Sequence, residues 1–489
     1  MSELKEQTIT SLKWQSIGRF STVGLSFVIG IVLARLLSPS DFGVLGVYAI
    51  FFAIAGTFID SGFSNALIQR KVITEEDCST VFWFNTALGV FFYLIFFFTS
   101  PLLADFFEIP ILEDIIKVTA INILIGALTA VQGTLYRKYL DFRTTAIVNV
   151  VSTLVSGIVG ITLAYIGFGV WSLVYQGLTS SIVNSALLWY FSKWRPHFLF
   201  SKKSFNEMFA YGSKLLGASL ISQIYFNAHT FVIGKFYTTR DLGLYNKGTG
   251  NAKILSTNLT AILSTITFPI LSQIQDDDER LIHAYRIYIK VTSLVIFFLM
   301  FVYAALAKPI TLFLYGSKWD GAITFMQIIC FGLMFDHICN INCNIFNVKG
   351  RSDIVLKSEI VKRIVSMTML LAAIPFGVVA ICVSVVVYNI VAVFINIYFT
   401  TTIFDYGFKK QWGDFCIYIL LSAIAAVPAL LISYLPIPYF LQILIGGLSS
   451  LGVYMLLLEM RHDEIFRDYI LVEIKRRFFK VNSKYLSNE

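Results

Sequence analysis

Residues 378–403, VVAICVSVVVYNIVAVFINIYFTTTI, carry no charged side chain over more than the length of one bilayer crossing. A helix of about 20 apolar residues spans the hydrocarbon core of a membrane. Thirteen further apolar runs of comparable length occupy most of the chain. They lie at roughly 15–37, 42–64, 80–104, 115–136, 145–166, 170–191, 208–234, 243–274, 284–307, 320–346, 354–375, 414–434 and 437–459. The sequence therefore predicts an all-α integral membrane protein with about fourteen transmembrane helices.

The composition agrees with this class and indicates an orientation. Of 489 residues, 57% are hydrophobic and 14% are charged, which excludes a soluble protein of this length. Most of the 38 lysines and arginines fall on one side of the predicted spans, and the outer loops hold only Arg35, Lys117, Lys235, Arg240, Lys308 and Lys318. Cytoplasmic loops carry such an excess of cations, so both termini are predicted to be cytoplasmic. The expected partners of this charge are membrane lipids, and no nucleic acid is expected.

Three short motifs recur in the two halves of the chain. They are FVIG at 27–30 and 231–234, DFG at 41–43 with DLG at 241–243, and FGV at 168–170 and 376–378. Together they favour a duplicated six-helix unit, whose even number of spans keeps both copies in the same orientation. We therefore expect two pseudo-symmetric six-helix bundles plus two C-terminal helices, with a cavity between the bundles.

Five parts follow from this organisation. An N-terminal six-helix lobe is predicted at 1–191, and an inner basic linker at 192–207. A C-terminal six-helix lobe is predicted at 208–404, and helices 13 and 14 at 405–459. The basic tail at 460–489 is predicted to be an amphipathic helix on the inner leaflet, with a disordered tail as the alternative.

Cations inside the predicted spans are the most informative polar residues. Arg19, Lys214, Lys247 and Lys253 lie within apolar runs. A charged side chain at the bilayer centre costs about 2.5–3.5 kcal/mol on insertion scales, so it usually faces a pathway or cavity. Arg19 and Lys214 lie near inner helix ends, where they could extend to the headgroups instead. Lys253 lies deeper in its span than Lys247, so a position facing a pathway or cavity best explains a lysine there.

The span at 243–274 is the most polar of the set. Lys247, Asn251 and Asn258 share one stripe at helical spacing, and Lys253 begins another. Such stripes either line a water-filled cavity that suits sugar hydroxyls or form hydrogen bonds between packed helices.

The span at 354–375 carries a charged group of its own. Glu359 and Arg363 are four residues apart and Lys362 lies beside them. This group either forms a local ion pair or lines the inner mouth of a cavity.

Four residues are candidates for coupling transport to an ion. Glu359 is one, and Asp60 and Asp336 are the remaining acids within spans. Either aspartate could titrate, bind a cation or pair with a lysine. His229 is a possible proton carrier, with an ordinary polar contact as the alternative.

A positively charged, hydroxyl-rich cavity suits an anionic, sugar-bearing substrate attached to a lipid. Phosphates would pair with arginine and lysine, and glycan hydroxyls with asparagine, serine and threonine. Transport by alternating access follows from a plan with two lobes. The predicted substrate-binding residues are Arg19, Lys214, Lys247, Asn251, Lys253, Asn258, Lys362 and Arg363.

Other function classes fit the sequence less well. A multidrug antiporter of the same fold is the closest alternative, but acids rather than cations would be expected in its cavity. A membrane sugar polymerase or transferase would need clustered acids, and the outer acids here are scattered. No GxxxxGK[ST] loop for ATP binding occurs. The chain is therefore predicted to be a transporter without catalytic residues, metal or cofactor, driven by a proton or sodium gradient.

Several segments resemble the polysaccharide-transporter family. The resemblance is closest to its branch of colanic-acid and teichuronic-acid exporters, within a superfamily that also contains multidrug exporters and lipid II flippases. The segments that carry it are ARLLSPSDFG at 34–43, DSGFSNALIQR at 60–70, STVFWFN at 79–85, IGKF at 233–236, LGLYN at 242–246 and FPILS at 268–272.

The resemblance implies a Wzx-type flippase with fourteen helices in the bacterial cytoplasmic (inner) membrane. Such a protein moves undecaprenyl-diphosphate-linked oligosaccharide from the inner to the outer leaflet, for O-antigen, capsule or exopolysaccharide assembly, and works with polysaccharide assembly proteins. The chain departs from the family pattern at His229 and Thr230, where relatives often have an acid followed by asparagine. This departure leaves the coupling ion open.

Overall fold

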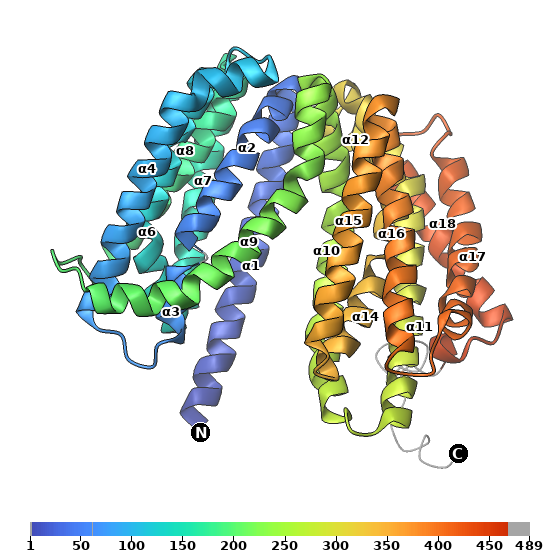
Figure 1. Cartoon of the computed structure of the whole chain (residues 1–489). Helices are drawn as coiled ribbons and strands as arrows, with labels where there is room; N and C mark the ends of the chain where they lie inside the picture. Colours follow the sequence, from blue (N-terminus) through green and yellow to red (C-terminus); the bar gives the residue numbers. More distant parts are fainter. Residues whose placement is uncertain (1, 61, 468–489) are drawn as a thin grey trace. The chain divides into compact units, whose positions relative to one another are not determined.

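The protein is built from α-helices, most of which run up and down within each of two compact units (Figure 1). The computed structural model describes residues 2–60 and 62–467, without the side chains of 2–9, 12, 60 and 257–269. No strand occurs among these residues, so the all-α prediction is confirmed. The helices are α1 (Ser2–Leu36), α2 (Pro39–Asp60), α3 (Phe63–Gln69), α4 (Glu75–Phe107), α5 (Leu112–Thr119), α6 (Ile121–Lys138), α7 (Phe142–Ile166), α8 (Val170–Phe191), α9 (Lys202–Phe236), α10 (Thr239–Gln273), α11 (Asp278–Ala305), α12 (Ala307–Tyr315), α13 (Asp320–Leu333), α14 (Asp336–Val348), α15 (Ser352–Ala373), α16 (Val378–Thr401), α17 (Phe408–Ile432) and α18 (Tyr439–Met460).

Each predicted apolar run falls on a helix, and some runs are divided between two. The run at 42–64 forms α2 and α3, the run at 115–136 forms α5 and α6, and the run at 320–346 forms α13 and α14. Within the described part of the chain, ten segments are long and apolar enough to cross a membrane, which agrees with the predicted fold class. The runs in α8, α9, α10 and α15 are outside these ten, so the number fourteen stays a prediction.

The chain divides into two compact units, Met1–Asn246 and Lys247–Glu489. In the first unit, α7 packs along α1 and α8, and α4 packs along α6. In the second unit, α11 packs along α17, which packs along α18, and α16 packs along α13 and α15. Because α9 packs on α2, α3 and α4, it groups with the first unit. The start of a second lobe at 208 stays a prediction.

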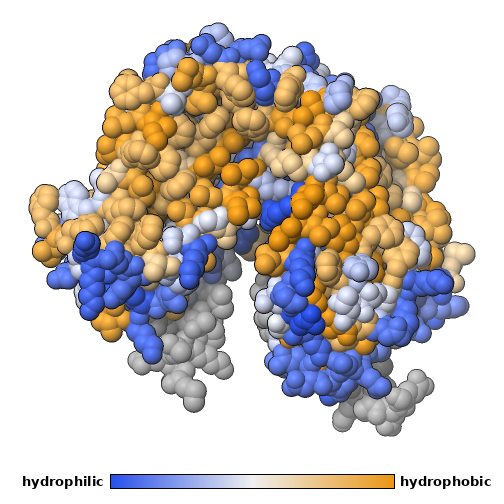
Figure 2. Space-filling view, viewed as in Figure 1, coloured by the Kyte–Doolittle hydropathy of each residue, from blue (hydrophilic) through white to orange (hydrophobic). Residues whose placement is uncertain are grey.

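The surface of each unit has the distribution that a bilayer requires. Apolar side chains cover the sides of the helices, and polar side chains gather at the helix ends (Figure 2). Large apolar residues such as Phe98, Ile158 and Leu431 are exposed along this apolar surface. Such a surface would not be stable in water, so it indicates contact with lipid. The predicted tail helix lies mostly at 468–489, outside the described residues.

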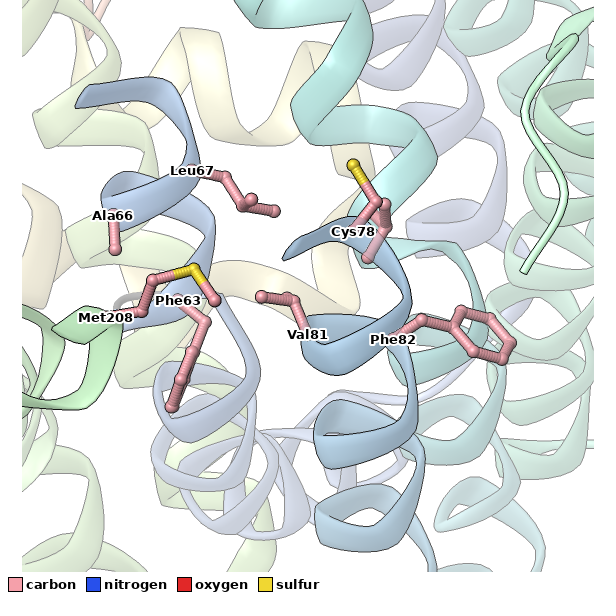
Figure 3. Packing of buried hydrophobic residues seen from close by; sticks show 8 residues of the cluster. Phe63, Ala66, Leu67, Cys78, Val81, Phe82 and Met208 are labelled. Carbon is pink, nitrogen blue, oxygen red and sulfur yellow. The ribbon is translucent and has the colours of Figure 1, made fainter. Parts of the chain in front are cut away.

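A small hydrophobic core holds the short helix α3 in the first unit. Phe63 and Leu67 of α3 pack with Val81 of α4 and Met208 of α9 (Figure 3). Seven residues are too few for a stable isolated helix, so α3 depends on this packing.

Charged side chains complete the end of α3. Lys138 Nζ donates hydrogen bonds to the carbonyls of Leu67 and Arg70, and this cation satisfies the C-terminal carbonyls of the helix. The guanidinium of Arg70 binds the carboxylates of Asp77 at 2.7 Å and Glu207 at 2.6 Å. These contacts join α4, α6 and α9 around α3 at one end of the unit.

Two repeat-related helix starts contact each other reciprocally. Ser38 caps α2 through Asp41, whose backbone N lies 3.3 Å from Ser38 Oγ, and Thr238 caps α10 through Asp241 in the same way at 3.1 Å. A Cβ built on Gly43 would lie 1.7 Å from the Thr239 carbonyl oxygen. A Cβ built on Gly243 would lie 1.8 Å from the Pro39 carbonyl oxygen. This exchange of equivalent contacts is what a two-fold relation between duplicated segments produces.

We expect Gly243→Ala to lower the thermal stability of the purified protein. The added methyl group would overlap the Pro39 carbonyl, and overpacking of this kind costs about 1–3 kcal/mol. The measurement is Tm in detergent by intrinsic fluorescence. Gly30→Ala is the matched control, because no atom beyond its chain neighbours and its own helix backbone lies within 4 Å of a Cβ built there. Equal Tm values for the two variants would contradict the tight contact.

Candidate functional site

A cavity of about 390 Å³ lies beside Arg19 in the first unit. Gly18 on α1 packs so closely against α7 that a Cβ built on it would lie 2.5 Å from Ala146 Cβ. The next side chain on α1, Arg19, and the preceding one on α7, Thr145, therefore flank a shared space. Arg137, near the end of α6, brings a second guanidinium to the cavity.

Aromatic and amide groups complete the lining of this cavity. Trp14 lines it from α1, and the guanidinium of Arg143 lies 5.5 Å from the centroid of the Trp14 ring. Asn149 lines it from α7, and its Oδ1 accepts a hydrogen bond of 3.2 Å from Asn184 Nδ2 on α8. The side chains therefore offer charge, hydroxyl, amide and aromatic surface within one cavity.

Arg351 of the second unit lies 208 residues after Arg143, the same offset as between the two FGV motifs, but it has a different role. Arg351 precedes α15 as Arg143 begins α7, but it donates two hydrogen bonds, of 2.9 and 3.0 Å, to Asp353. These hydrogen bonds lower the pKa of the Asp353 carboxyl to about 2. The charge of Arg351 is thereby compensated locally, so the duplication does not carry the chemistry of the Arg19 cavity over to this position.

Lys247 and Asn251 lie together on α10 against α12. Lys247 Nζ lies 4.0 Å from the ring centroid of Tyr315 and 5.6 Å from that of Trp319, a cation–π arrangement. The Tyr315 hydroxyl donates a hydrogen bond of 2.9 Å to Asn251 Oδ1. Asn251 is buried, so this structure favours the interpretation of a contact between packed helices for it.

Lys253 has an acidic neighbour on another helix. It is exposed on α10, and Asp336, the first residue of α14, lies close enough for the two charges to attract each other. An ion pair between Lys253 and Asp336, one of the alternatives for this acid, stays a prediction.

Glu359 joins the two cations of α15. Its carboxylate binds Lys362 Nζ and lies 3.6 Å from Arg363 Nη2, so the predicted local ion pair is present. Lys362 is buried, and its Nζ lies 3.7 Å from Cys343 Sγ on α14. The group therefore holds α15 to α14 as well as pairing charges along one helix.

The remaining predicted residues lie apart from these groups. Lys214 is exposed on α9, just beyond the close approach of Gly212 to Gly62, and His229 is half-buried further along α9. The side chains of Asp60 and Asn258 lie outside the described residues.

Sequence reasoning missed Arg137 and Thr145, which it counted only among inner anchors and helix residues. The sequence could have indicated this grouping. Arg137 directly follows the predicted span 115–136, Thr145 begins the next span, and Arg19 lies near the inner end of the first span.

Comparisons with known proteins now define the class. The fold is shared with a lipid II flippase MurJ in an inward closed conformation, at a TM-score of 0.71 and 16% identity over 92% of this chain and 99% of that one. It is also shared with an inward-facing multidrug resistance MATE family transporter, at a TM-score of 0.61 and 16% identity over 80% of this chain and 98% of that one. The class is therefore a multi-span α-helical membrane protein of the fold common to these two transporters.

The family is narrower than the fold. The model of the family described as "Polysaccharide biosynthesis protein" matches residues 32–324. The chain therefore belongs to this family. It is 27% identical over 366 residues to the lipopolysaccharide biosynthesis protein WzxC of Escherichia coli strain K12, covering 73% of each chain. It is 28% identical over 318 residues to the succinoglycan biosynthesis transport protein ExoT of Rhizobium meliloti strain 1021, covering 65% of this chain and 64% of that one. The resemblance carried by the sequence segments is thus confirmed.

We expect Lys253 and Asp336 to be energetically coupled. Lys253→Met and Asp336→Asn should each lower Tm in detergent, and the double variant should lose less than the sum, since removing one partner leaves the other charge uncompensated. Contacting charged residues show coupling of about 0.5–3 kcal/mol.

The control combines Lys253→Met with Asp320→Asn, because Asp320 is exposed at the start of α13. These two changes should be additive. Additivity for Lys253 and Asp336 as well would show that the two charges do not form a pair.

Proposed function

We propose that the protein is a flippase that moves undecaprenyl-diphosphate-linked oligosaccharide from the inner to the outer leaflet by alternating access. On this proposal it is a transporter rather than an enzyme, and it serves the assembly of O-antigen, capsule or exopolysaccharide. Membership of the polysaccharide biosynthesis family supports the proposal, as do the similarity to the succinoglycan biosynthesis transport protein ExoT and the fold shared with the lipid II flippase MurJ.

The observation that carries it is the charge balance of the Arg19 cavity. Two guanidinium groups, Arg19 and Arg137, line it, and none of its described lining residues is acidic. The cations of the other predicted groups have a carboxylate or aromatic rings beside them, as Lys362 and Lys247 do. Uncompensated positive charge attracts an anion more strongly, so this cavity is the best placed to hold a diphosphate.

The lining residues match the rest of such a substrate. Guanidinium groups bind phosphate oxygens in a bidentate manner. Thr145 and Asn149 offer hydrogen-bonding groups for sugar hydroxyls. Trp14 and Phe142 provide apolar surface where a polyprenyl tail could leave the cavity for the bilayer. In this proposal the headgroup crosses inside the protein while the tail stays in lipid.

The proposal also covers the energy source of transport and the membrane in which the protein lies. The protein would lie in the bacterial cytoplasmic (inner) membrane with both termini in the cytoplasm and would work with polysaccharide assembly proteins. A proton or sodium gradient would drive the cycle, and no cofactor would be needed. Asp336 beside Lys253 and Glu359 beside Lys362 are the candidate coupling groups, because protonation of either acid would release a cation from its partner.

A multidrug antiporter is the second candidate, supported by the fold shared with the MATE transporter. The two candidates differ in the charge they require. A cationic drug would be repelled by Arg19 and Arg137, whereas a diphosphate would be attracted. The cavity therefore favours the lipid-linked anion.

We expect Arg19→Gln and Arg137→Gln each to reduce translocation at least tenfold, because each removes one of the two cations that line the cavity. The measurement is movement of labelled undecaprenyl-diphosphate-linked oligosaccharide in proteoliposomes, with surface polysaccharide in cells as a second readout. Arg19→Lys keeps the charge but loses the guanidinium plane, so its activity should fall between wild type and Arg19→Gln.

Arg280→Gln is the matched control, since Arg280 is an exposed arginine at the start of α11. It should transport as the wild type does. Full activity in Arg19→Gln, Arg137→Gln and the double variant, all inserted at normal levels, would overturn the proposed site.

A further inference from the structure

A second cavity lies in the second unit, between α11, α17 and the turn that follows α18. It has a volume of about 250 Å³. It lies at the N-terminal part of α11 and α17 and just beyond the C-terminus of α18. The residues that form it are Lys290, Asp414, Tyr418, Arg461, His462, Asp463 and Glu464, together with Gly413, Ile417 and Ile465.

The buried part of this cavity is held rigidly by hydrogen bonds. Asp414 is 4% exposed, and Arg286 donates two hydrogen bonds to its carboxylate, at 2.8 and 3.0 Å. The Tyr406 hydroxyl donates a third, at 2.6 Å, to the same carboxylate. Because both oxygens are engaged, the floor keeps its shape whether or not a ligand is present.

A second buried carboxylate supports the opposite wall. Asp463 is 8% exposed, and the Tyr418 hydroxyl donates a hydrogen bond of 3.1 Å to its Oδ2. Its Oδ1 accepts from the backbone N of Phe466 at 3.0 Å. The turn after α18 is thereby fixed against α17.

The accessible rim carries charges of both signs. The side chains of Lys290 and Arg461 are 30% and 45% exposed, and Glu464 is exposed beside them. His462 also lines the cavity and has a left-handed backbone, φ 54°, which a glycine would adopt at less cost. Lys290 Nζ lies 3.5 Å from Asp414 Oδ1 and Arg461 Nη1 lies 3.8 Å from Asp463 Oδ2, so both rim cations also pair with the buried carboxylates. When Arg286 below the floor is included, three cations balance three carboxylates.

Aromatic residues place this cavity at the level of the lipid headgroups. The three helices α11, α17 and α18 are all among the segments able to cross a membrane, and the cavity lies along the N-terminal halves of α11 and α17 and at the C-terminal end of α18. Trp412, one turn from Phe408 on α17, is exposed and stacks on it at 5.6 Å between ring centroids. Exposed tryptophan is typical of the boundary between hydrocarbon and water.

We propose that this cavity binds the headgroup of a zwitterionic phospholipid of the phosphoethanolamine type. The phosphate would lie between Lys290 and Arg461, and the ammonium group would face Glu464 and Asp463. An anionic headgroup would gain the same cations but would face the exposed acid Glu464 without a positive group to offset it. The acyl chains would lie along the apolar sides of α17 and α18. This binding does not depend on the proposed transport function.

The test is the Tm of purified, delipidated protein in detergent with added short-chain phosphatidylethanolamine, phosphatidylglycerol or free phosphoethanolamine. A ligand that binds only the folded state raises Tm, and the rise grows with the ratio of ligand concentration to Kd. Phosphatidylethanolamine should raise Tm by several degrees at a concentration at which phosphatidylglycerol raises it by less than half as much. Free phosphoethanolamine should have little effect, because it lacks the acyl contacts.

Two variants change the response in opposite ways. Arg461→Gln should lose most of the shift with phosphatidylethanolamine. Glu464→Gln leaves the cavity with net positive charge, so its response should turn in favour of phosphatidylglycerol. Lys410→Gln is the control, since Lys410 is exposed near the start of α17 and pairs with Asp405 outside the cavity.

Three outcomes would overturn the proposal. They are an equal response of wild type to the two lipids, an unchanged preference in Glu464→Gln, and an equal shift with free phosphoethanolamine, which would mean a soluble ligand. Because Glu464 is exposed and its removal breaks no buried ion pair, this variant keeps the test decisive even if Arg461→Gln fails to fold.

Discussion

The absence of hydrogen-bonding partners in hydrocarbon governs the placement of polar side chains in this protein. Every polar group in a span must be satisfied by the protein itself. Many hydroxyls bond within their own helix, as Ser152 does to the Val148 carbonyl at 2.7 Å. Others join helices, as Thr400 on α16, Gln411 on α17 and Asn342 on α14 do in one buried group. Polar groups that keep an unbalanced charge after such contacts are the ones best suited to bind a charged substrate.

This constraint explains how far the sequence could predict the structure. The apolar runs, the helical class and the capping pairs at Ser38 and Thr238 are local features, and local features can be read from spacing and composition. The partner of a polar residue is not local, because Tyr315 binds Asn251 from 64 residues away. A stripe of lysines and asparagines on α10 therefore predicts polarity on one face without showing whether that face meets water or another helix. The acid beside Lys253 was one of several predicted alternatives, whereas the arginine that joins Arg19 in its cavity was not predicted.

The duplication transmits backbone geometry more faithfully than side-chain chemistry. The starts of α2 and α10 keep the same cap and the same glycine contact, because a methyl group at either glycine would collide with a carbonyl oxygen. The repeat-related Arg143 and Arg351 instead meet different neighbours, a tryptophan ring and a carboxylate. A glycine in a close contact is restricted by steric overlap, whereas an exposed arginine can pair with whatever group lies near it. The sequence repeat therefore predicts the fold of both copies, but it does not predict a binding site in either copy.

Local charge balance also distinguishes the two cavities from each other. The Arg19 cavity has guanidinium groups and no acid among its described lining residues, so it has a surplus of positive charge. The cavity at the end of α17 has carboxylates and cations in equal number, with its floor fixed by Asp414. In a medium of low dielectric constant a ligand must supply the charge that the site lacks, since an unbalanced charge is costly there. A diphosphate meets this condition in the first cavity and a zwitterionic headgroup meets it in the second. The two cavities can therefore lie in one membrane protein, in contact with the same lipids, and still select different molecules.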